Sequence, residues 1–461
     1  MAAMRRFITN SSNYRTKLRL TPARIILLGF FSLILTGTLL LLIPSASHSG
    51  VPVPVSKALF TSASAVCVTG LVATDTAQTW SMFGQAVILV LIQIGGLGFM
   101  SVTTIFYFIM GKKIGLSQRL LIVQSLDLRD IQGAVRLIRH VLLGTLIFEG
   151  AGALLLFSRF APRFGLRKGL WMSVFHSVSA FCNAGFDIMG EKIAFSSLTS
   201  FSGDAVVIVT VAALVAIGGV GFFVWEDIWN KRSFKRLHLY SKLVLTVSLW
   251  LVVSGWILLY LTEMTNPDTI GNMPFPQAAL ASLFQSVMPR SGGFSVVNQA
   301  ALRDVSKTLI MILMLIGGSA GSTAGGIKNA TVGVLFLSAI SSLRGKSNLT
   351  VYNRTIPHRQ IINALSVMLV MLTVCFAGAV SISLIQPELL FAGVIFEAVS
   401  AVTICGLSHG ITSDLVPASS IIVVLLMFFG RIGIMTFGMA TFLKRNKVEK
   451  TKSPDSWILM G

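Results

Sequence analysis

Four short segments of the sequence carry a glycine in the same local setting, each after an apolar stretch that is too short to cross a membrane. The apolar stretches are Lys57–Cys67, Trp171–Cys182, Ala278–Met288 and Leu390–Thr403. The segments that follow them are Val68-Thr69-Gly70, Asn183-Ala184-Gly185, Ser291-Gly292-Gly293 and Ile404-Cys405-Gly406. An apolar stretch of this length suits a re-entrant segment. Lipid cannot satisfy the free backbone carbonyls of such a segment, so they are tolerated only where they line an enclosed or water-filled path.

The chemistry of these segments is that of a cation site. Four of them around one axis would stack rings of carbonyl oxygens, which can replace the hydration shell of a monovalent cation. Glycine permits the positive φ that turns successive carbonyls toward one side. The C-terminal ends of the four short helices add partial negative charge toward the same axis. We therefore predict that the twelve residues form an ion-binding filter.

The spacing of the segments indicates an internal repeat. Gly70, Gly185, Gly293 and Gly406 lie 115, 108 and 113 residues apart. A second landmark follows each glycine after 25, 33, 24 and 24 residues, and it begins at Gly95, Gly218, Gly317 and Gly430. Two landmarks in the same register predict four copies of one unit. For the glycines at 95–98 and 218–221 we favour close helix packing as their role.

Eight apolar stretches are long enough to span a bilayer, two for each copy. They run near Ala23–Ile43, Phe83–Met110, Leu137–Phe157, Ala205–Ile228, Leu243–Leu261, Thr308–Leu343, Ile361–Ile385 and Pro417–Leu443. The sequence thus predicts an all-α polytopic membrane protein. It has four repeats of a spanning helix (M1), a pore loop and a second spanning helix (M2) around a central pore. The first stretch is longer than the apolar core of a signal peptide, so we interpret it as a retained span.

The expected boundaries follow from these stretches. A cytoplasmic tail covers residues 1–22, the repeats cover 23–110, 137–229, 240–343 and 360–443, and a second cytoplasmic tail covers 444–461.

The charge distribution predicts the orientation in the membrane. The chain has 37 Lys and Arg against 17 Asp and Glu, a net charge of +20. With both termini in the cytoplasm, 26 of the Lys and Arg fall in inside segments and 8 in outside segments. This is the positive-inside pattern of a plasma-membrane protein, so nucleic acid need not be invoked as a partner. Arg159, Arg163, Arg167 and Lys168 depart from the pattern because they lie outside.

The third repeat is the exception among the four. Its M2 stretch contains Gly317-Gly318-Ser319-Ala320-Gly321-Ser322-Thr323-Ala324-Gly325-Gly326 and then Lys328. Each glycine costs a helix about 1 kcal/mol relative to alanine, so we expect a broken helix beside a cavity. Arg431 lies at the corresponding depth of the fourth repeat, and free carbonyls of the broken stretch would be natural partners for it. We interpret the pair as a gate; the alternative is a structural kink pinned by the arginine.

Other residues near the expected pore have structural interpretations. Cys67, Cys182 and Cys405 lie within three residues of the filter glycines and have no metal-binding spacing, so we interpret them as small packing residues rather than redox sensors. His176 and Glu397 lie in the short pore helices, where we expect anchoring hydrogen bonds rather than ion contact.

The four pore loops, the broken third M2 and the Phe429-Gly430-Arg431 motif resemble the Trk/Ktr/HKT potassium transporter superfamily, most closely its KtrB-type membrane subunits. The resemblance implies that Gly70, Gly185, Gly293 and Gly406 line the selectivity filter. It implies that Gly317–Gly326 form a gating loop held by Arg431. It also implies a homodimer on a cytoplasmic ring of KtrA-type subunits, which would carry the nucleotide. Potassium in the filter is the expected ion, and no covalent cofactor is expected.

Two alternatives remain at this stage. Family members with serine at the first filter glycine favour sodium, so a sodium-selective or sodium-coupled relative is the nearer one; Gly70 points to potassium instead. The more distant alternative is an intramembrane enzyme. It would need a nucleophile and a base facing each other inside the spans, and the sequence offers no such constellation.

Overall fold

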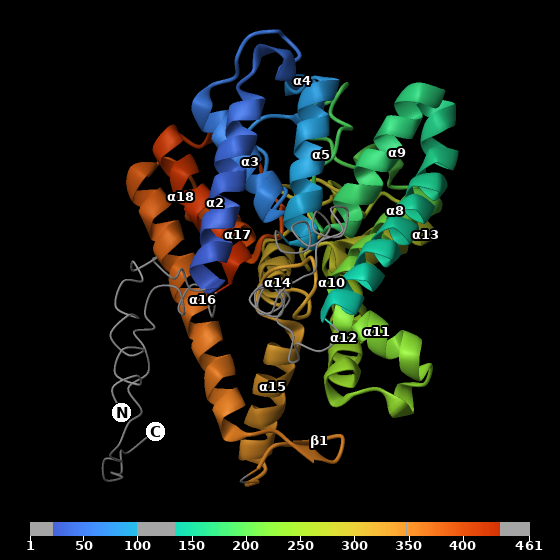
Figure 1. The fold of residues 1–461 in the computed structure, drawn as a ribbon, viewed down its shortest axis with the longest axis vertical. Helices are drawn as coiled ribbons and strands as arrows, with labels where there is room; N and C mark the ends of the chain where they lie inside the picture. Colours follow the sequence, from blue (N-terminus) through green and yellow to red (C-terminus); the bar gives the residue numbers. More distant parts are fainter. Residues whose placement is uncertain (1–21, 99–133, 347, 434–461) are drawn as a thin grey trace, which may run out of the picture.

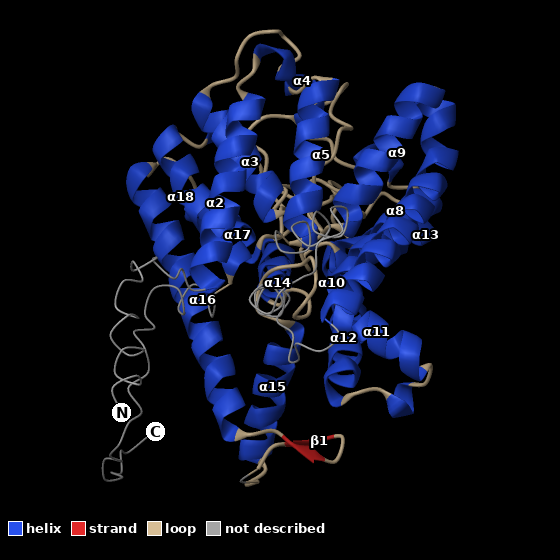
Figure 2. Ribbon diagram, viewed as in Figure 1, coloured by secondary structure: helices blue, strands red, loops and turns tan. Residues whose placement is uncertain are grey.

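The computed structural model describes residues 22–98, 134–346 and 348–433, and these residues fold almost entirely into helices (Figure 1, Figure 2). Within these ranges the one sheet is a hairpin of two short strands, β1 (Thr350–Val351) and β2 (Arg354–Thr355). Helices satisfy their own backbone hydrogen bonds, which is what a membrane demands. Residues 1–21 and 444–461 of the expected tails, and residues 99–110 and 434–443 of the first and last repeats, lie outside the described residues.

The described helices form four successive units with the same order of elements. The M1 helices are α2 (Pro22–Leu41), α8 (Ala134–Phe164), α12 (Leu239–Glu263) and α16 (His358–Ile385). The pore helices are α3 (Val55–Cys67), α9 (Leu166–Phe181), α13 (Phe275–Val287) and α17 (Phe391–Thr403). The M2 helices are α5 (Met82–Leu97), α10 (Ala205–Val220), α14 (Asp304–Leu315) and α18 (Pro417–Ile432). The predicted fourfold M1–pore loop–M2 architecture is confirmed.

Within the described residues, the M2 helices are shorter than the M1 helices. Among the described residues, only the four M1 helices are long and apolar enough to span a membrane alone. A fifth span results if α10 is joined to α11 (Phe222–Lys231), although the two are bent by 92°. The stretch Ala205–Ile228, expected as one span, is thus divided between two helices. The break lies at Gly221, whose φ of +98° ends the helix, and α5 and α18 reach the same kind of cap at Gly98 and Gly433.

The third M2 is interrupted as expected. After α14 ends at Leu315, no helix forms until α15 (Asn329–Leu343). The two ends of this non-helical stretch pair with each other, because Gly317 N–H donates to the Ile327 carbonyl at 3.0 Å. Below it, α15 lies beside α16 and both run toward the β1–β2 hairpin at one end of the molecule (Figure 1).

Small residues bring three M1 helices against their pore helices. A Cβ on Gly37, Gly152 or Gly255 would overlap a serine hydroxyl of the adjacent pore helix. Each of these serines donates to an M1 carbonyl three residues before the glycine. The bonds are Ser62 to Ile34 at 2.7 Å, Ser177 to Glu149 at 2.6 Å and Ser286 to Val252 at 2.7 Å. Close approach over a small residue and a hydroxyl bond between helices are both typical of membrane packing.

This packing predicts opposite effects for two neighbouring glycines of α8. Gly152→Ala would place its Cβ 2.6 Å from Ser177 Oγ and from a methyl group of Leu214, so the hydroxyl has to leave the Glu149 carbonyl. We expect a loss of about 1–3 kcal/mol from such overpacking. Gly150→Ala is the matched control, because its Cβ meets nothing within 4 Å and alanine favours a helix. Thermal unfolding of the purified variants should rank Gly152→Ala below wild type and Gly150→Ala at or above it; equal midpoints would contradict the packing argument.

Candidate ion-conducting site

The four filter segments share one backbone conformation. Their first residues have left-handed φ angles of 59°, 59°, 66° and 48°, at Val68, Asn183, Ser291 and Ile404. Their glycines have positive φ angles of 89°, 68°, 73° and 90°, at Gly70, Gly185, Gly293 and Gly406. Left-handed backbone is uncommon outside glycine and unfavourable for β-branched residues such as valine and isoleucine. Its recurrence in all four units shows that the surrounding structure imposes it.

The four glycines form a closed ring. A Cβ on Gly70 would lie 3.1 Å from Gly185 Cα, and one on Gly185 would lie 2.7 Å from Gly293 Cα. A Cβ on Gly293 would lie 3.0 Å from the Cys405 carbonyl oxygen, and one on Gly406 would lie 3.0 Å from Gly70 Cα. Each filter segment thus contacts the next in chain order, and the fourth returns to the first. The structure brings together all four segments that the sequence singled out.

Serines of the pore helices hold the filter backbone. Gly70 N–H donates to Ser64 Oγ and Gly406 N–H donates to Ser400 Oγ, each at 3.1 Å. In the second unit the equivalent Ser179 donates instead to the Phe186 carbonyl at 2.7 Å. These bonds are buried, so each filter segment they reach is fixed to the end of its own pore helix.

His176 and Glu397 occupy the same position in opposite units, seven residues before the first filter residue. Each accepts a hydrogen bond from the backbone five residues after that residue. Ile188 N–H donates to His176 Nε2 at 3.5 Å, and His409 N–H donates to Glu397 Oε1 at 3.0 Å. His176 Nδ1 is 2.7 Å from the Met172 carbonyl, which sets Nδ1 as its donor. Both side chains therefore anchor the chain where it leaves the filter.

The glycine landmarks of M2 allow these helices to pass directly behind the pore helices. A Cβ on any of three of them would collide with the carbonyl oxygen two residues before the filter. The colliding pairs are Gly95 with Val66, Gly218 with Phe181, and Gly430 with Val402. This arrangement agrees with the packing role that we favoured for these glycines.

The non-helical stretch of the third unit lies against the base of the filter. Thr323 Oγ1 donates to Asn183 Oδ1 at 2.7 Å, and Gly325 N–H donates to Ser291 Oγ at 3.1 Å. A Cβ on Gly325 would also collide with the Ile404 side chain. The stretch therefore contacts the first filter residues of the second, third and fourth units. Lys328 closes it from below, because its Nζ donates to the Ala324 carbonyl at 2.9 Å.

Arg431 joins this stretch to two M2 helices. Its Nη1 donates to the Thr323 carbonyl at 2.8 Å, so the guanidinium does contact the broken stretch. Its Nη2 donates to the Gly96 carbonyl at 3.2 Å and makes a shorter contact with the Gly95 carbonyl. The second contact is not evident from the sequence. Its signal is the end of α5 at Gly98, because a helix C-terminus carries a partial negative charge, although Gly98 N–H already donates to the Gly95 carbonyl.

A polar cluster lies behind the second filter segment. Glu149 of α8 accepts a hydrogen bond from Gln93 Nε2 at 3.2 Å, and Cys182 Sγ lies 3.8 Å from its other oxygen. Glu149 is buried, and an ionisable side chain inside a membrane needs a polar partner. Gln93 is such a partner within the bundle. All four cysteines are buried and unpaired, and the described residues contain no group of three potential metal ligands.

Asp187 lies just outside the filter, in the connection that leads to α10. The pKa of its carboxyl is raised to about 7, chiefly by burial; the Met189 N–H opposes this rise and the nearby Asp75 adds to it. A carboxyl with this pKa changes its charge near neutral pH, and it lies two residues after Gly185.

Sequence comparison gives the family. The sequence model of the family described as TrkH, cation transport protein, matches residues 6–450. The chain belongs to this family. It is therefore a multi-pass membrane protein that transports cations, and it is not an enzyme. This TrkH-family chain is 38% identical over 451 residues to the potassium/sodium uptake protein NtpJ of Enterococcus hirae, covering 97% of this chain and 99% of the relative.

Two further proteins resemble this TrkH-family chain. The Ktr system potassium uptake protein B of Bacillus subtilis is 37% identical over 443 residues, 96% of this chain and 97% of its own. The crystal structure of the potassium transporter TrkH from Vibrio parahaemolyticus has a similar fold, with a TM-score of 0.74 over 93% of this chain and 87% of that one. Its sequence identity is 17%, so it supports the fold.

The pKa of Asp187 predicts that transport depends on the outer pH. Above about pH 7 the carboxylate attracts cations to the filter entrance, and below it the neutral acid does not. One unit charge roughly 10 Å away in water contributes about 0.4 kcal/mol, so cation uptake should fall about twofold as the outer pH drops from about 8 to about 6. Asp187→Asn should transport at the low-pH rate throughout. Asp268→Asn, at an exposed outer carboxylate, is the control; an unchanged pH profile in Asp187→Asn would refute the assignment.

Proposed function

We propose that this chain takes up potassium through a selectivity filter formed by the backbone of residues 68–70, 183–185, 291–293 and 404–406. The observation that carries the proposal is the closed ring of four glycines. Because all four segments share the same alternation of φ, their carbonyls form successive rings around one axis, which suits a dehydrated monovalent cation. The potassium ion is cargo held in the filter, and no covalent cofactor takes part.

A sodium-selective or sodium-coupled transporter is the second candidate. The name of the Enterococcus hirae relative includes both potassium and sodium, and that protein has 38% identity to this chain. Gly70 supports potassium, because the ring has no side chain at its first position.

We further propose that residues 317–326 and Arg431 form the gate. The stretch contacts the base of three filter segments, and it has acceptors to spare because it is not helical. Arg431 holds the Thr323 carbonyl with one nitrogen and the end of α5 with another. In this position the stretch and the guanidinium obstruct the path below the filter, and the positive charge also repels a cation there.

The orientation and the assembly belong to the same proposal. The 26 Lys and Arg of the expected inside segments support cytoplasmic termini in a bacterial plasma membrane. The name of the Bacillus subtilis relative identifies it as one protein of a Ktr system. We propose that this chain forms a homodimer on a cytoplasmic, nucleotide-binding KtrA-type ring, whose acidic surface would complement the basic inner face.

The filter assignment is tested at Gly70. Gly70→Ser adds a Cβ that collides with the Ala184 carbonyl, so it should distort one quarter of the ring. We expect the ratio of potassium to sodium uptake to fall about tenfold, which corresponds to about 1.4 kcal/mol of lost discrimination. The assay is uptake of both ions in proteoliposomes, with growth of a potassium-uptake-deficient bacterium on low potassium as the cellular readout. Gly50→Ser is the matched control, since Gly50 also has positive φ (+70°) but meets nothing within 4 Å. An unchanged ratio in Gly70→Ser would remove Gly70 from the filter.

The gate assignment is tested at Arg431. A charge near the bilayer centre costs about 2.5–3.5 kcal/mol, so the contacts of Arg431 are expected to offset this cost. Arg431→Ala, or a deletion within 321–326, should raise basal potassium flux several-fold and reduce its dependence on the cytoplasmic subunit. The ion preference should stay the same, because the filter is untouched. Flux is measured in proteoliposomes with and without that subunit, at equal protein content, and the exposed Arg344→Ala serves as control. If both variants insert stably yet conduct no faster than wild type, the stretch is a structural kink.

A further inference from the structure

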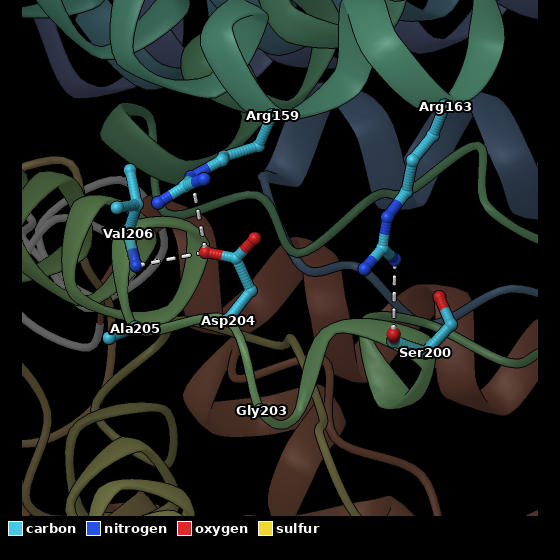
Figure 3. Close-up of a pocket in the computed structure, with 7 residues that line it drawn as sticks. All are labelled: Arg159, Arg163, Ser200, Gly203, Asp204, Ala205 and Val206. Carbon is cyan, nitrogen blue, oxygen red and sulfur yellow. Dashed lines mark hydrogen bonds and ion pairs between the residues drawn. The ribbon is translucent and has the colours of Figure 1, made fainter.

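The four outer cations at 159–168 break the positive-inside pattern, and two of them line a cleft. Arg159 and Arg163 lie four residues apart on α8, so they project from the same face of the helix. They line a surface cleft of about 460 Å³ together with Ser200, Gly203, Asp204, Ala205 and Val206 (Figure 3). The other two cations of the group are not among its lining residues. The cleft lies where α8 ends and α10 begins, on the expected outer side of the membrane.

Contacts on the protein hold both guanidinium groups in place without using most of their donors. Arg159 Nε lies 3.6 Å from Asp204 Oδ1. Arg163 Nη1 donates to the Ser200 carbonyl at 3.4 Å, and its guanidinium stacks over the buried Phe201 ring at 4.3 Å. Each guanidinium carries five N–H groups. In the described part of the chain, these are the polar contacts that the two groups make, so several N–H groups face the cleft (Figure 3).

The charge of the cleft favours an anion. Two arginines face one carboxylate, and Asp204 Oδ1 already accepts from the N–H groups of Val206 and Val207 at 3.0 and 3.3 Å as the cap of α10. The net charge of the lining is therefore positive. The carboxylate of Asp204 would still repel an anion bound directly beside it. Guanidinium groups bind phosphate oxygens in a forked geometry, which favours a phosphate over a simple halide.

The surroundings of the cleft indicate where such a phosphate comes from. One turn before Arg159, Leu154 and Leu155 of α8 are 72% and 52% exposed. An apolar helix surface below a pair of arginines matches a phospholipid, whose acyl chains lie along the helix and whose headgroup lies at the interface. We propose that Arg159 and Arg163 bind the phosphate of an anionic phospholipid of the outer leaflet.

The test is lipid binding by the purified full-length protein in detergent. Phosphatidylglycerol, phosphatidylcholine and inorganic phosphate are titrated separately, and both the thermal midpoint and the number of retained lipids by native mass spectrometry are recorded. The double variant Arg159→Gln/Arg163→Gln should raise the half-saturating phosphatidylglycerol concentration at least about tenfold. It should also lose one retained lipid. Arg167→Gln/Lys168→Gln removes the same charge on the same side outside the cleft, and it should change this concentration less than about twofold.

Each remaining outcome decides the proposal. If both double variants weaken phosphatidylglycerol binding equally, only the total charge of this side matters. If neither weakens it, the cleft binds no lipid. Either result overturns the proposal. Equal stabilisation by inorganic phosphate and by phosphatidylglycerol assigns the site to a free phosphate ion and overturns the lipid assignment. Arg163→Lys covers the case in which the double variant fails to fold. It keeps the charge but loses the forked geometry, so it should weaken phosphatidylglycerol binding, and wild-type binding would overturn the role of Arg163.

Discussion

Carbonyl oxygens that end a helix inside a membrane must find partners there, and this requirement organises the centre of the molecule. Four pore helices and at least three M2 helices end near the same level, each leaving its last carbonyls without helical partners. Arginine has five donors and no acceptor, so a single side chain can serve several such oxygens. Arg431 bonds to carbonyls of two different units and thereby ties the end of α5 to the broken stretch of the third unit. In the proposed filter, the cation would be the partner of the remaining carbonyls.

The four units have the same filter backbone but different supports. The second and fourth units hold the chain beyond the filter through His176 and Glu397. At the equivalent position the first unit has Thr61, which bonds to its own helix at Lys57, and the third has the apolar Phe284. In the third unit the pore helix also ends earlier, at Val287, and Ser291 bonds to Gly325 of the broken stretch. The second and third filter segments are thus both hydrogen-bonded to the proposed gate, through Asn183 and Ser291.

Much of this arrangement can be predicted from the sequence because it depends on local features that recur. The spacing of Gly70, Gly185, Gly293 and Gly406 predicts the fourfold unit, and the glycine-rich run after Gly317 predicts the interrupted helix. The left-handed φ of Val68 and Ile404 could not be predicted, since β-branched residues disfavour it and tertiary packing imposes it. The contact from Arg431 to Gly95 joins residues 336 positions apart, so the sequence can indicate the helix end at Gly98 but not which donor reaches it. The bend at Gly221 was missed because its glycine belongs to a run that also serves helix packing.

The strength of the contacts around the broken stretch bears on whether it can move. Apart from the pairing of its own ends, it is held through Thr323 on Asn183, Gly325 on Ser291 and Arg431 on Thr323. Backbone bonds also tie it to the second M2, because the N–H groups of Ser319 and Thr323 donate to the carbonyls of Gly219 and Gly218, and Phe222 N–H donates to the Gly321 carbonyl. Tyr240 of α12 donates to the Ala320 carbonyl at 3.2 Å. A neutral hydrogen bond contributes about 0.5–1.5 kcal/mol net and one to a charged group about 1.5–3 kcal/mol. The contacts of Thr323, Gly325 and Arg431 alone amount to a few kcal/mol, and the bonds to the second M2 and to Tyr240 add to this, so the stretch stays in place most of the time. Coupling between two sites of a protein is typically about 1–3 kcal/mol. A partner bound at the cytoplasmic face could supply part of the energy needed to release the stretch, whereas a continuous helix at this place would resist such a change.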